Sequence, residues 1–183
     1  MKLDLKKLAL VAVPLIVIVI ILIGVVKALG NVSKSTSSDS TTYQLAKQKA
    51  VATLNRVFTF PLGTTGGSFK FTLIDADLQK QIIVKGSRVT AIDGRIFLIL
   101  NLKLANNQSQ GLQVNTRDFI RLSVNGNTAE FFAPEIHNDP VDVHAISTQP
   151  ARVGFPVNES DKNFVLRVGE INGKKQDVPL VFK

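Results

Sequence analysis

The sequence predicts an all-β domain, an antiparallel sandwich, carried behind one apolar segment long enough to cross a membrane. Two observations predict the domain: apolar and polar residues alternate over most of the chain after residue 55, and turn dipeptides separate these stretches. A third observation predicts the segment. The mean hydropathy is +0.19 although 20% of the residues are charged, so apolar residues must be concentrated somewhere, and the first thirty residues contain that concentration.

Residues 8–26 form an uninterrupted apolar segment, LALVAVPLIVIVIILIGVV, without a charged or hydrogen-bonding side chain. As a helix it would span about 28 Å, close to the thickness of the hydrocarbon core of a bilayer. Residues 1–7 contain three lysines and a single acid. This excess of positive charge predicts residues 1–7 as a cytoplasmic flank and the remainder of the chain outside the cytoplasm. We therefore expect residues 8–26 to be a transmembrane helix in contact with membrane lipid.

A cleaved signal peptide is the alternative for the same segment. Its apolar core would normally extend over about 7–15 residues and end at a small-residue cleavage site. The apolar run in this chain is longer, and its only candidate site, Ala28-Leu29-Gly30, directly follows Lys27. Both features favour a retained anchor.

Residues 27–54 are predicted to be a flexible Ser/Thr-rich tether and juxtamembrane segment. Residues 31–42, NVSKSTSSDSTT, have too little to bury to offset the entropy of ordering. Residues 43–57 contain good helix formers but only a weak apolar face, so a short helix and an extended lead-in to the domain both remain open. The folded domain is expected at residues 55–183.

Alternation and turn signals predict seven to nine short strands in residues 55–183. Asp93-Gly94, Asn125-Gly126 and Asn172-Gly173 each lie between apolar stretches, and such dipeptides are the strongest short-range signal of a β-hairpin. Short strands joined in this way are typical of an antiparallel β-sandwich, with a small β-barrel as the alternative.

One strand is expected at the centre of a sheet. In residues 95–105 five aliphatic side chains share one face, and Phe97 and Ile99 make the other face partly apolar, which suits a strand covered on both sides. Residues 133–150 contain few turn signals and are predicted to cross between the two sheets. The remaining predicted strands cover residues 58–62, 69–78, 82–85, 88–92, 120–124, 128–132, 164–168 and 178–182.

Two stretches carry a family resemblance. They are FLILNLKLANNQSQGLQVNTRDFIRLSVNG at residues 97–126 and LRVGEINGKKQDVPLVFK at residues 166–183. A strand ending in Asn-Asn, a polar loop, the pattern D-F-x-R-L and a glycine turn resemble the bacterial extracellular domains of unknown function related to the mycobacterial immunoprotective antigens. The resemblance implies an immunoglobulin-like sandwich over residues 55–183, behind a membrane anchor and a linker. It implies no catalytic residues, and the chain lacks the lipobox cysteine of the lipoproteins in that group.

The one cluster of metal-ligand side-chain types lies within the predicted crossover. It comprises Glu135, His137, Asp139, Asp142 and His144. Carboxylates suit Ca²⁺ and imidazoles suit Zn²⁺, so a set that mixes them matches neither ion well. Alternation explains the same run if Val141, Val143 and Ala145 face inward, and Asp139-Pro140 is typical of a turn. We expect no metal ion here and keep the five residues as candidate ligands.

The sequence offers no catalytic set, so we expect no enzyme and no cofactor. The chain contains no cysteine, which excludes a thiol nucleophile and disulfides, and no G-x-S-x-G pattern. Asp75 and Asp77 share one face of a predicted strand, as paired catalytic carboxylates would. Acid–base catalysis also needs a cleft and a perturbed environment, which the sequence does not indicate, so it favours a solvated strand face or a salt bridge to a neighbouring Lys or Arg. The glycine-rich residues 63–67 lack the lysine and the helix of a phosphate-binding loop.

The net charge of +8 is mild once it is divided along the chain. Residues 1–30 contribute +3 and the remainder +5, without a basic run interleaved with aromatic residues, so we expect no nucleic-acid partner. The sequence predicts a non-enzymatic, single-pass cell-surface binding or adhesion module with an unidentified protein or cell-envelope partner. Its C-terminal domain would be extracellular or periplasmic.

An extracytoplasmic accessory subunit that docks on an integral membrane complex is the alternative function. A large exposed apolar patch on the sandwich would favour docking. A polar, concave loop end would favour the capture of a ligand.

Overall fold

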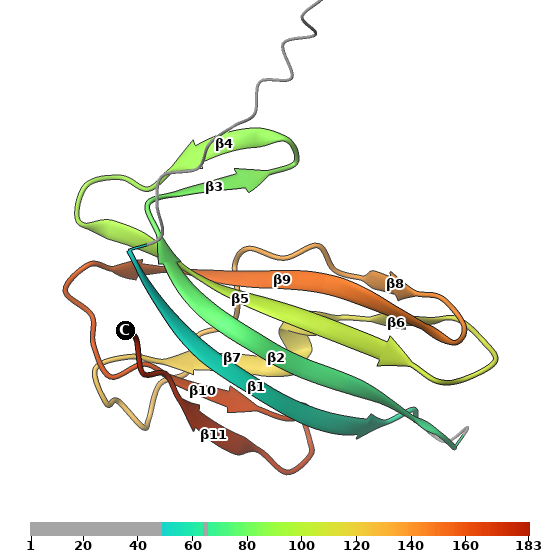
Figure 1. Ribbon diagram of the computed structural model, residues 1–183. Helices are drawn as coiled ribbons and strands as arrows, with labels where there is room; N and C mark the ends of the chain where they lie inside the picture. Colours follow the sequence, from blue (N-terminus) through green and yellow to red (C-terminus); the bar gives the residue numbers. More distant parts are fainter. Residues whose placement is uncertain (1–48, 64–65) are drawn as a thin grey trace, which may run out of the picture. The chain divides into compact units, whose positions relative to one another are not determined.

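The computed structural model describes residues 49–63 and 66–183 (Figure 1). The predicted cytoplasmic flank at 1–7, the predicted transmembrane helix at 8–26 and most of the predicted tether at 27–54 lie outside these residues. Within the described part of the chain, no helix has the length and apolar character needed to cross a membrane.

The described residues form eleven strands and one short 3-10 helix, η1. Their bounds are β1 Ala50–Pro61, β2 Ser68–Gln79, β3 Gln81–Val84, β4 Ser87–Thr90, β5 Arg95–Asn106, β6 Leu112–Val114, η1 Thr116–Asp118, β7 Ile120–Ser123, β8 Val141–Val143, β9 Ser147–Asn158, β10 Val165–Val168 and β11 Gln176–Pro179. All the strand pairs are antiparallel. This confirms the predicted all-β class for the described residues.

Four long strands form the first sheet in the order β1-β2-β5-β9. The central position of β5 is confirmed, since it pairs with β2 on one side and β9 on the other. Its five alternating aliphatic side chains are at most 2% exposed: Ile96, Leu98, Leu100, Leu102 and Leu104. Ile99, which lies on the opposite face, is also buried, as expected for a strand covered on both sides.

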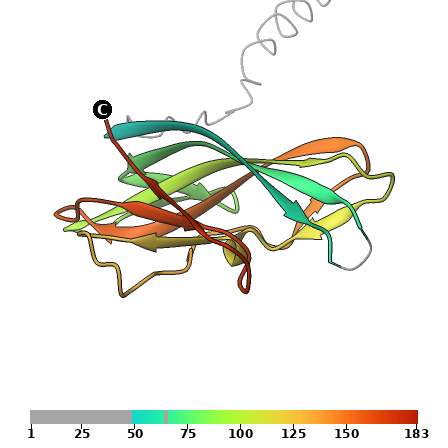
Figure 2. The same cartoon turned by 90° about the horizontal axis from the view of Figure 1, so that it is seen from below.

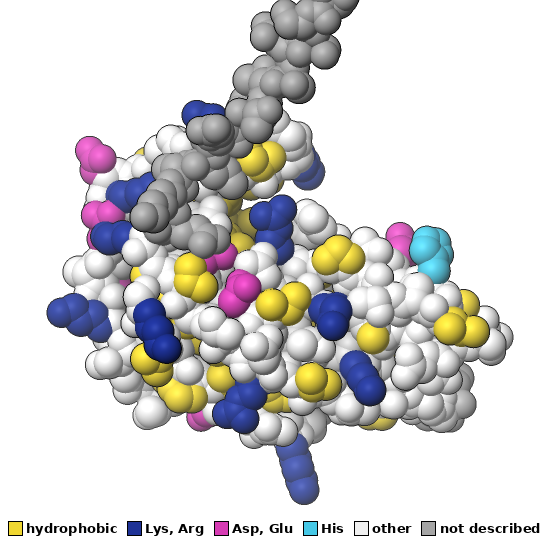
Figure 3. Space-filling view, in the orientation of Figure 1, with side chains coloured by type: hydrophobic (Ala, Val, Ile, Leu, Met, Phe, Trp, Pro, Cys, Tyr) yellow, Lys and Arg dark blue, Asp and Glu magenta, His cyan; other side chains and the backbone are white. Residues whose placement is uncertain are grey.

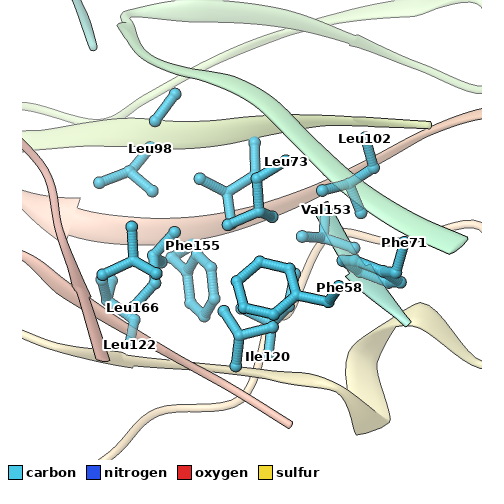
Figure 4. Packing of buried hydrophobic residues seen from close by; sticks show 14 of the residues in the cluster. Phe58, Phe71, Leu73, Leu98, Leu102, Ile120, Leu122, Val153, Phe155 and Leu166 are labelled. Carbon is cyan, nitrogen blue, oxygen red and sulfur yellow. The ribbon is translucent and has the colours of Figure 1, made fainter. Parts of the chain in front are cut away.

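The second sheet has the order β11-β10-β7 and packs against the first as a separate layer (Figures 1 and 2). Side chains of both layers meet in one core, where Leu98 and Phe155 of the first sheet lie near Leu122 and Leu166 of the second (Figure 4). The described sheets are open and do not close on themselves. The sandwich is therefore confirmed, and the alternative of a small barrel is wrong.

The connections of this sandwich differ from those of an immunoglobulin constant domain. There, the third strand lies in the sheet opposite the first two. Here β5, the third strand of the two main sheets in chain order, lies beside β2 in the first sheet, and β7 lies in the second. Two small ladders, β3-β4 and β6-β8, flank the main sheets.

The first strand begins within the segment predicted as a tether. β1 starts at Ala50, and Ala52 is 1% exposed in the core. Of the two alternatives for residues 43–57, the extended one describes residues 50–57. Pairing with β2 outweighs the helical propensity of these residues, and a bulge near Asn55, which has a φ of 48°, restores the alternation for the second half of the strand.

Two of the three predicted hairpin dipeptides lie in turns between paired segments. Asn172-Gly173 lies in the loop of the β10–β11 hairpin. Asn125 and Gly126 have φ values of 58° and 70°, as a type I′ turn requires. After this turn only Phe132 pairs with Leu122, so the predicted strand at 128–132 is reduced to a single bridge.

The third dipeptide, Asp93-Gly94, makes a turn but not the predicted hairpin. β4, which precedes it, pairs with β3 through a turn at Lys85-Gly86, and β5, which follows it, pairs with β2. The physical reason is the length of β5. Because β5 has twelve residues and one fully apolar face, it forms more stabilising cross-strand pairs with the equally long β2 than it could form with the four residues of β4.

Residues 133–150 carry the chain from the second sheet to the first, as predicted. They connect β7 to β9, with Ile136 bridging Gly154 of β9 and β8 pairing with β6. Val143 is 1% exposed, as the alternation predicts. The inward position predicted for Ala145 is wrong, because β8 ends at Val143 and Ala145 is exposed.

Candidate functional site

A groove of about 700 Å³ opens at one end of the sandwich. Its lining residues come from the β1–β2 connection, β6, η1 and the β10–β11 loop; the ribbons of these elements can be followed in Figure 1. Its volume falls within the range that is usual for ligand sites in proteins.

A phenylalanine cluster forms the floor of the groove. Phe119 lines the groove and is half-buried, and its ring centroid lies 4.6 Å from that of Phe60, 5.6 Å from Phe69 and 5.8 Å from Phe71. Those three partners are at most 7% exposed. The exposed part of Phe119 is therefore an apolar surface held rigidly by the core beneath it.

The position of Phe119 depends on η1, which is fixed by a residue of the crossover. The Asp139 carboxylate accepts hydrogen bonds from Thr116 N at 2.7 Å, Thr116 Oγ1 at 2.6 Å and Arg117 N at 2.9 Å. The side chain of Asn115, at the N-cap position, makes no capping bond, so Asp139 supplies the cap from elsewhere in the chain.

Two carboxylates give the groove negative charge. Asp118, the last residue of η1, and Glu170, in the β10–β11 loop, both line the groove and are half-buried. Neither makes an ion pair with any described residue. Lys175 is near Glu170 in the chain, but its Nζ donates to the carbonyl oxygens of Glu170, Ile171 and Gly173 and so holds the loop.

A second hollow, of about 270 Å³, is lined by residues that include Arg95, Glu135 and Asp161. Arg95 donates to Asn158 Oδ1 at 2.9 Å and to the Pro156 carbonyl at 2.8 Å, and Asp161 accepts from Asn125 at 2.9 Å. Glu135 is exposed and adds a carboxylate to the same lining. This hollow is smaller than the groove, and because Arg95 lies beside its carboxylates its charge is mixed.

The structure brings together two of the five candidate metal ligands. His137 Nδ1 lies 3.4 Å from Asp139 Oδ2, and Arg117 Nη1 lies 3.5 Å from His137 Nε2. Asp142 accepts a hydrogen bond from Gln113 at 2.8 Å. Glu135 and His144 form hydrogen bonds through backbone groups. Glu135 N donates to the Gly154 carbonyl oxygen, and the His144 carbonyl oxygen accepts from Asn106 Nδ2. Among residues 49–63 and 66–183, no group of three or more such side chains is placed to hold a metal ion.

Asp75 and Asp77 do share one face of β2, with Ala76 between them pointing into the core. Asn101 Nδ2 donates to Asp75 Oδ1 at 2.6 Å and to Asp77 Oδ2 at 3.1 Å, and Gln79 also donates to Asp77. Asp77 is only 1% exposed, so the expectation of a solvated strand face is wrong for it. Burial raises the pKa of Asp77, and the neighbouring Asp75 raises it further, whereas the two amide donors and Arg152 act in the opposite direction.

The sequence analysis did not predict the groove, although two patterns in the sequence contain residues that line it. Asp118-Phe119 opens the D-F-x-R-L pattern, and Glu170-Ile171 precedes the Asn172-Gly173 turn. Nothing in either signal shows that these segments meet at one end of the sandwich. That information lies in the strand order.

No family model matches the chain, and no curated protein matches it. Three solved structures are similar. A conserved hypothetical protein from Bacillus anthracis has a TM-score of 0.50 and 12% identity, over 73% of this chain and 98% of that one. An uncharacterized β-sandwich protein from Clostridium difficile 630 has a TM-score of 0.49 and 16% identity, over 70% of this chain and 91% of that one. A functionally unknown protein from Listeria monocytogenes has a TM-score of 0.44 and 12% identity, over 73% of this chain and 84% of that one.

These likenesses concern the fold. Residues 49–63 and 66–183 form a β-sandwich by the order of their own sheets, and the protein from Bacillus anthracis has a similar fold over nearly its whole length. The function must be argued from the groove.

Proposed function

We propose that the chain is a non-enzymatic binding module on the outer side of the cytoplasmic membrane, and that it captures its ligand in the groove at the loop end of the sandwich. One observation carries this proposal: two half-buried carboxylates, Asp118 and Glu170, form no ion pair with the described residues and border a rigid apolar floor formed by Phe119. In this proposal residues 8–26 anchor the chain. The resemblance of residues 97–126 and 166–183 supports a place among the extracellular sandwich domains related to the mycobacterial immunoprotective antigens, with strand connections that differ from those of an immunoglobulin constant domain.

The distribution of exposed apolar side chains favours capture of a ligand over docking on a membrane complex. Among the described residues, the exposed large apolar side chains are spread over seven positions along the chain: Val57, Val89, Ile92, Phe132, Ile146, Ile171 and Val181. On the face drawn in Figure 3, yellow side chains lie singly or in small groups among blue and white ones. Docking surfaces are usually contiguous apolar patches, so this surface supports the accessory-subunit alternative less well.

The described lining of the groove suits the binding of a ligand. Its described polar side chains are carboxylates and amides. Amides both donate and accept hydrogen bonds, and carboxylates accept them and attract cations, so together these groups can fix the orientation of a bound molecule.

A photo-crosslinking amino acid placed at Ile171 tests the proposed function. Ile171 lies on the groove and is 59% exposed, and Ile146, which is 79% exposed and is not part of the groove lining, provides the matched control. The full-length protein carrying either label is irradiated in intact cells. We expect an adduct from position 171 that is absent from position 146. The same adducts from both positions, or adducts from position 146 alone, would contradict capture in the groove.

Alkaline extraction and external protease treatment of the same cells test the anchor. A retained helix at residues 8–26 should keep the uncleaved chain in the membrane fraction after extraction, with the domain digested from outside. A shortened chain in the soluble fraction would support the signal-peptide alternative. A membrane-bound chain protected from protease would contradict the proposed orientation.

A further inference from the structure

We propose that the ligand of the groove is a basic peptide segment, whose lysine or arginine side chains lie along Phe119 and end beside Asp118 and Glu170. This inference rests on the proposed function of the same groove and adds the chemical class of its ligand.

The charge of the groove is opposite to that of the protein. The chain has a net charge of +8, yet the described lining of the groove contains two carboxylates and no basic side chain. Three basic residues close to these carboxylates in the chain are engaged elsewhere. The Arg117 guanidinium contacts His137, Arg167 pairs with Asp177, and Lys175 Nζ is held by three carbonyl oxygens. Lys174 follows the lining residue Gly173, but it is exposed and does not itself line the groove. Charge of one sign in a concave site concentrates ligands of the opposite sign, here cations.

The apolar part of the groove suits the stem of such a cation. Leu62, Phe119 and Ile171 line it beside the carboxylates. Lysine and arginine side chains bury their aliphatic stems along apolar surfaces while the charged end stays at a polar group. A cation close to an aromatic ring gains a further attraction, which a neutral side chain of the same length lacks.

The polar groups on the groove favour a peptide over a small amine. Asn115 and Asn172 line it, and their side-chain amides make no hydrogen bond with the described residues. An amide both donates and accepts, as the backbone of a bound peptide requires. The two carboxylates belong to different elements, η1 and the β10–β11 loop, which suits a ligand with more than one cationic side chain.

Methyl NMR of the full-length protein in phosphatidylcholine nanodiscs tests the inference. The probes are the tripeptides acetyl-Lys-Leu-Lys-amide, acetyl-Gln-Leu-Gln-amide and acetyl-Glu-Leu-Glu-amide, together with n-butylammonium. The methyl signals of Ile171 report on the groove, and those of Ile146 report on a surface outside it. We expect the lysine peptide to shift the Ile171 signals saturably, the glutamine peptide to bind several-fold more weakly, and the Ile146 signals to stay in place.

A charge-removing variant completes the test. Asp118→Asn combined with Glu170→Gln keeps the shape of both side chains and should weaken the lysine peptide about tenfold, since each partly buried carboxylate contributes a few-fold. Asp93→Asn combined with Glu130→Gln removes two exposed carboxylates that do not line the groove and should leave the affinity unchanged.

The outcomes separate this inference from the proposed function. If the glutamine and lysine peptides bind equally well, the proposal that the ligand is basic would be wrong, but the groove would still be a binding site. If n-butylammonium binds as tightly as the lysine peptide, the proposal that the ligand is a peptide would be wrong. If no probe moves the Ile171 signals, the ligand class is wrong, and the crosslinking at Ile171 decides the proposed function separately.

Discussion

Asp139 caps η1 through Thr116, whose backbone N and Oγ1 donate to the same carboxylate oxygen at 2.7 and 2.6 Å. The Asp139 side chain is 4% exposed, and the bond from Arg117 N engages its second oxygen. A residue that the sequence offers as a metal ligand thus serves as a cap between the crossover and η1. Because η1 carries Asp118 and leads into Phe119, this cap also shapes the groove.

Asp139→Ala should therefore lower the free energy of unfolding by about 2–3 kcal/mol, because it leaves buried donors without an acceptor. Urea unfolding of the full-length protein in detergent measures the loss. Asp142→Ala is the control, since Asp142 is exposed and, among the described residues, its side chain is bonded only to Gln113; it should stay within about 0.5 kcal/mol of the parent protein. A rise in the parent protein's Tm on adding Zn²⁺ or Ca²⁺ that Asp139→Ala abolishes would contradict the capping role and assign a metal ligand.

Asn106 should prove far more important to stability than its neighbour Asn107. Asn106 is fully buried, its Nδ2 donates to the carbonyl oxygens of Gln110, Val143 and His144, and its Oδ1 accepts from Gln108 N. Removing this buried side chain removes all four hydrogen bonds at once, so Asn106→Ala should cost about 2–3 kcal/mol of unfolding free energy.

Urea unfolding of both variants checks this expectation. Asn107→Ala, at an exposed position, should change the unfolding free energy by less than about 0.5 kcal/mol. Asn106→Asp should be at least as damaging as Asn106→Ala, because a carboxylate cannot donate to the three carbonyl oxygens. Similar losses for Asn106→Ala and Asn107→Ala would show that the hydrogen bonds of Asn106 do not hold the loop.

The sequence predicts the strands well because alternation is a local property. Residues 95–105 illustrate this, since the face that their pattern assigns to the core is the face that is buried. Pairing depends on the whole sheet. Asp93-Gly94 forms a turn, as its local chemistry requires, but the partner of β5 is decided by the competition between β2 and β4, which no local pattern encodes.

The candidate site was less predictable for the same reason. The pattern at residues 135–144 displays ligand types in one run, yet the structure directs Asp139 toward Thr116 and Asp142 toward Gln113. The groove brings Asp118 together with Glu170, which are far apart in the sequence. The fold therefore gives Asp139 and Asp142 different partners although they are close in sequence, and it places Asp118 and Glu170 on one groove although they are distant in sequence.

Gly154 should resist substitution because the crossover lies directly against it. Gly154 N donates to the Ile136 carbonyl at 2.7 Å, and Ile136 N donates back at 3.1 Å. A Cβ at position 154 would lie 2.6 Å from Ile99 Cδ1 and 3.3 Å from Ile136 Cβ. Gly154→Ala should therefore destabilise the protein by about 1–2 kcal/mol, the usual cost of overpacking.

Thermal or urea unfolding compares this variant with Gly111→Ala. A Cβ at position 111 would meet no atom closer than 3.7 Å, so that variant should keep or slightly raise the stability. Ile99→Val removes the nearest atom, and combining it with Gly154→Ala should cost less than the sum of the two single changes. Strict additivity would mean that Ile99 does not cause the strain.

Asp77 should make the stability depend on pH. Its pKa is raised in the folded state, chiefly by burial, so the folded protein binds this proton more readily than the unfolded chain does. The contribution of Asp77 to the free energy of unfolding is therefore most favourable below the ordinary pKa of an aspartate, about pH 4. It is lost as the pH rises through the raised pKa of the folded state. Asp77→Asn removes the buried charge, so the stability of this variant relative to the parent protein should increase between about pH 4 and neutrality.

Two measurements check the titration of Asp77. Urea unfolding of the parent protein and of Asp77→Asn across this range gives the difference in stability, which should be smallest at the acid end. Carboxyl NMR then compares Asp77 in the parent protein and in Asp75→Asn. Asp75 raises the pKa of Asp77 by repulsion, so removing its charge should bring that pKa down. A difference in stability that does not change with pH would mean that Asp77 titrates equally in the folded and unfolded states, and that its amide partners Gln79 and Asn101 fully offset its burial.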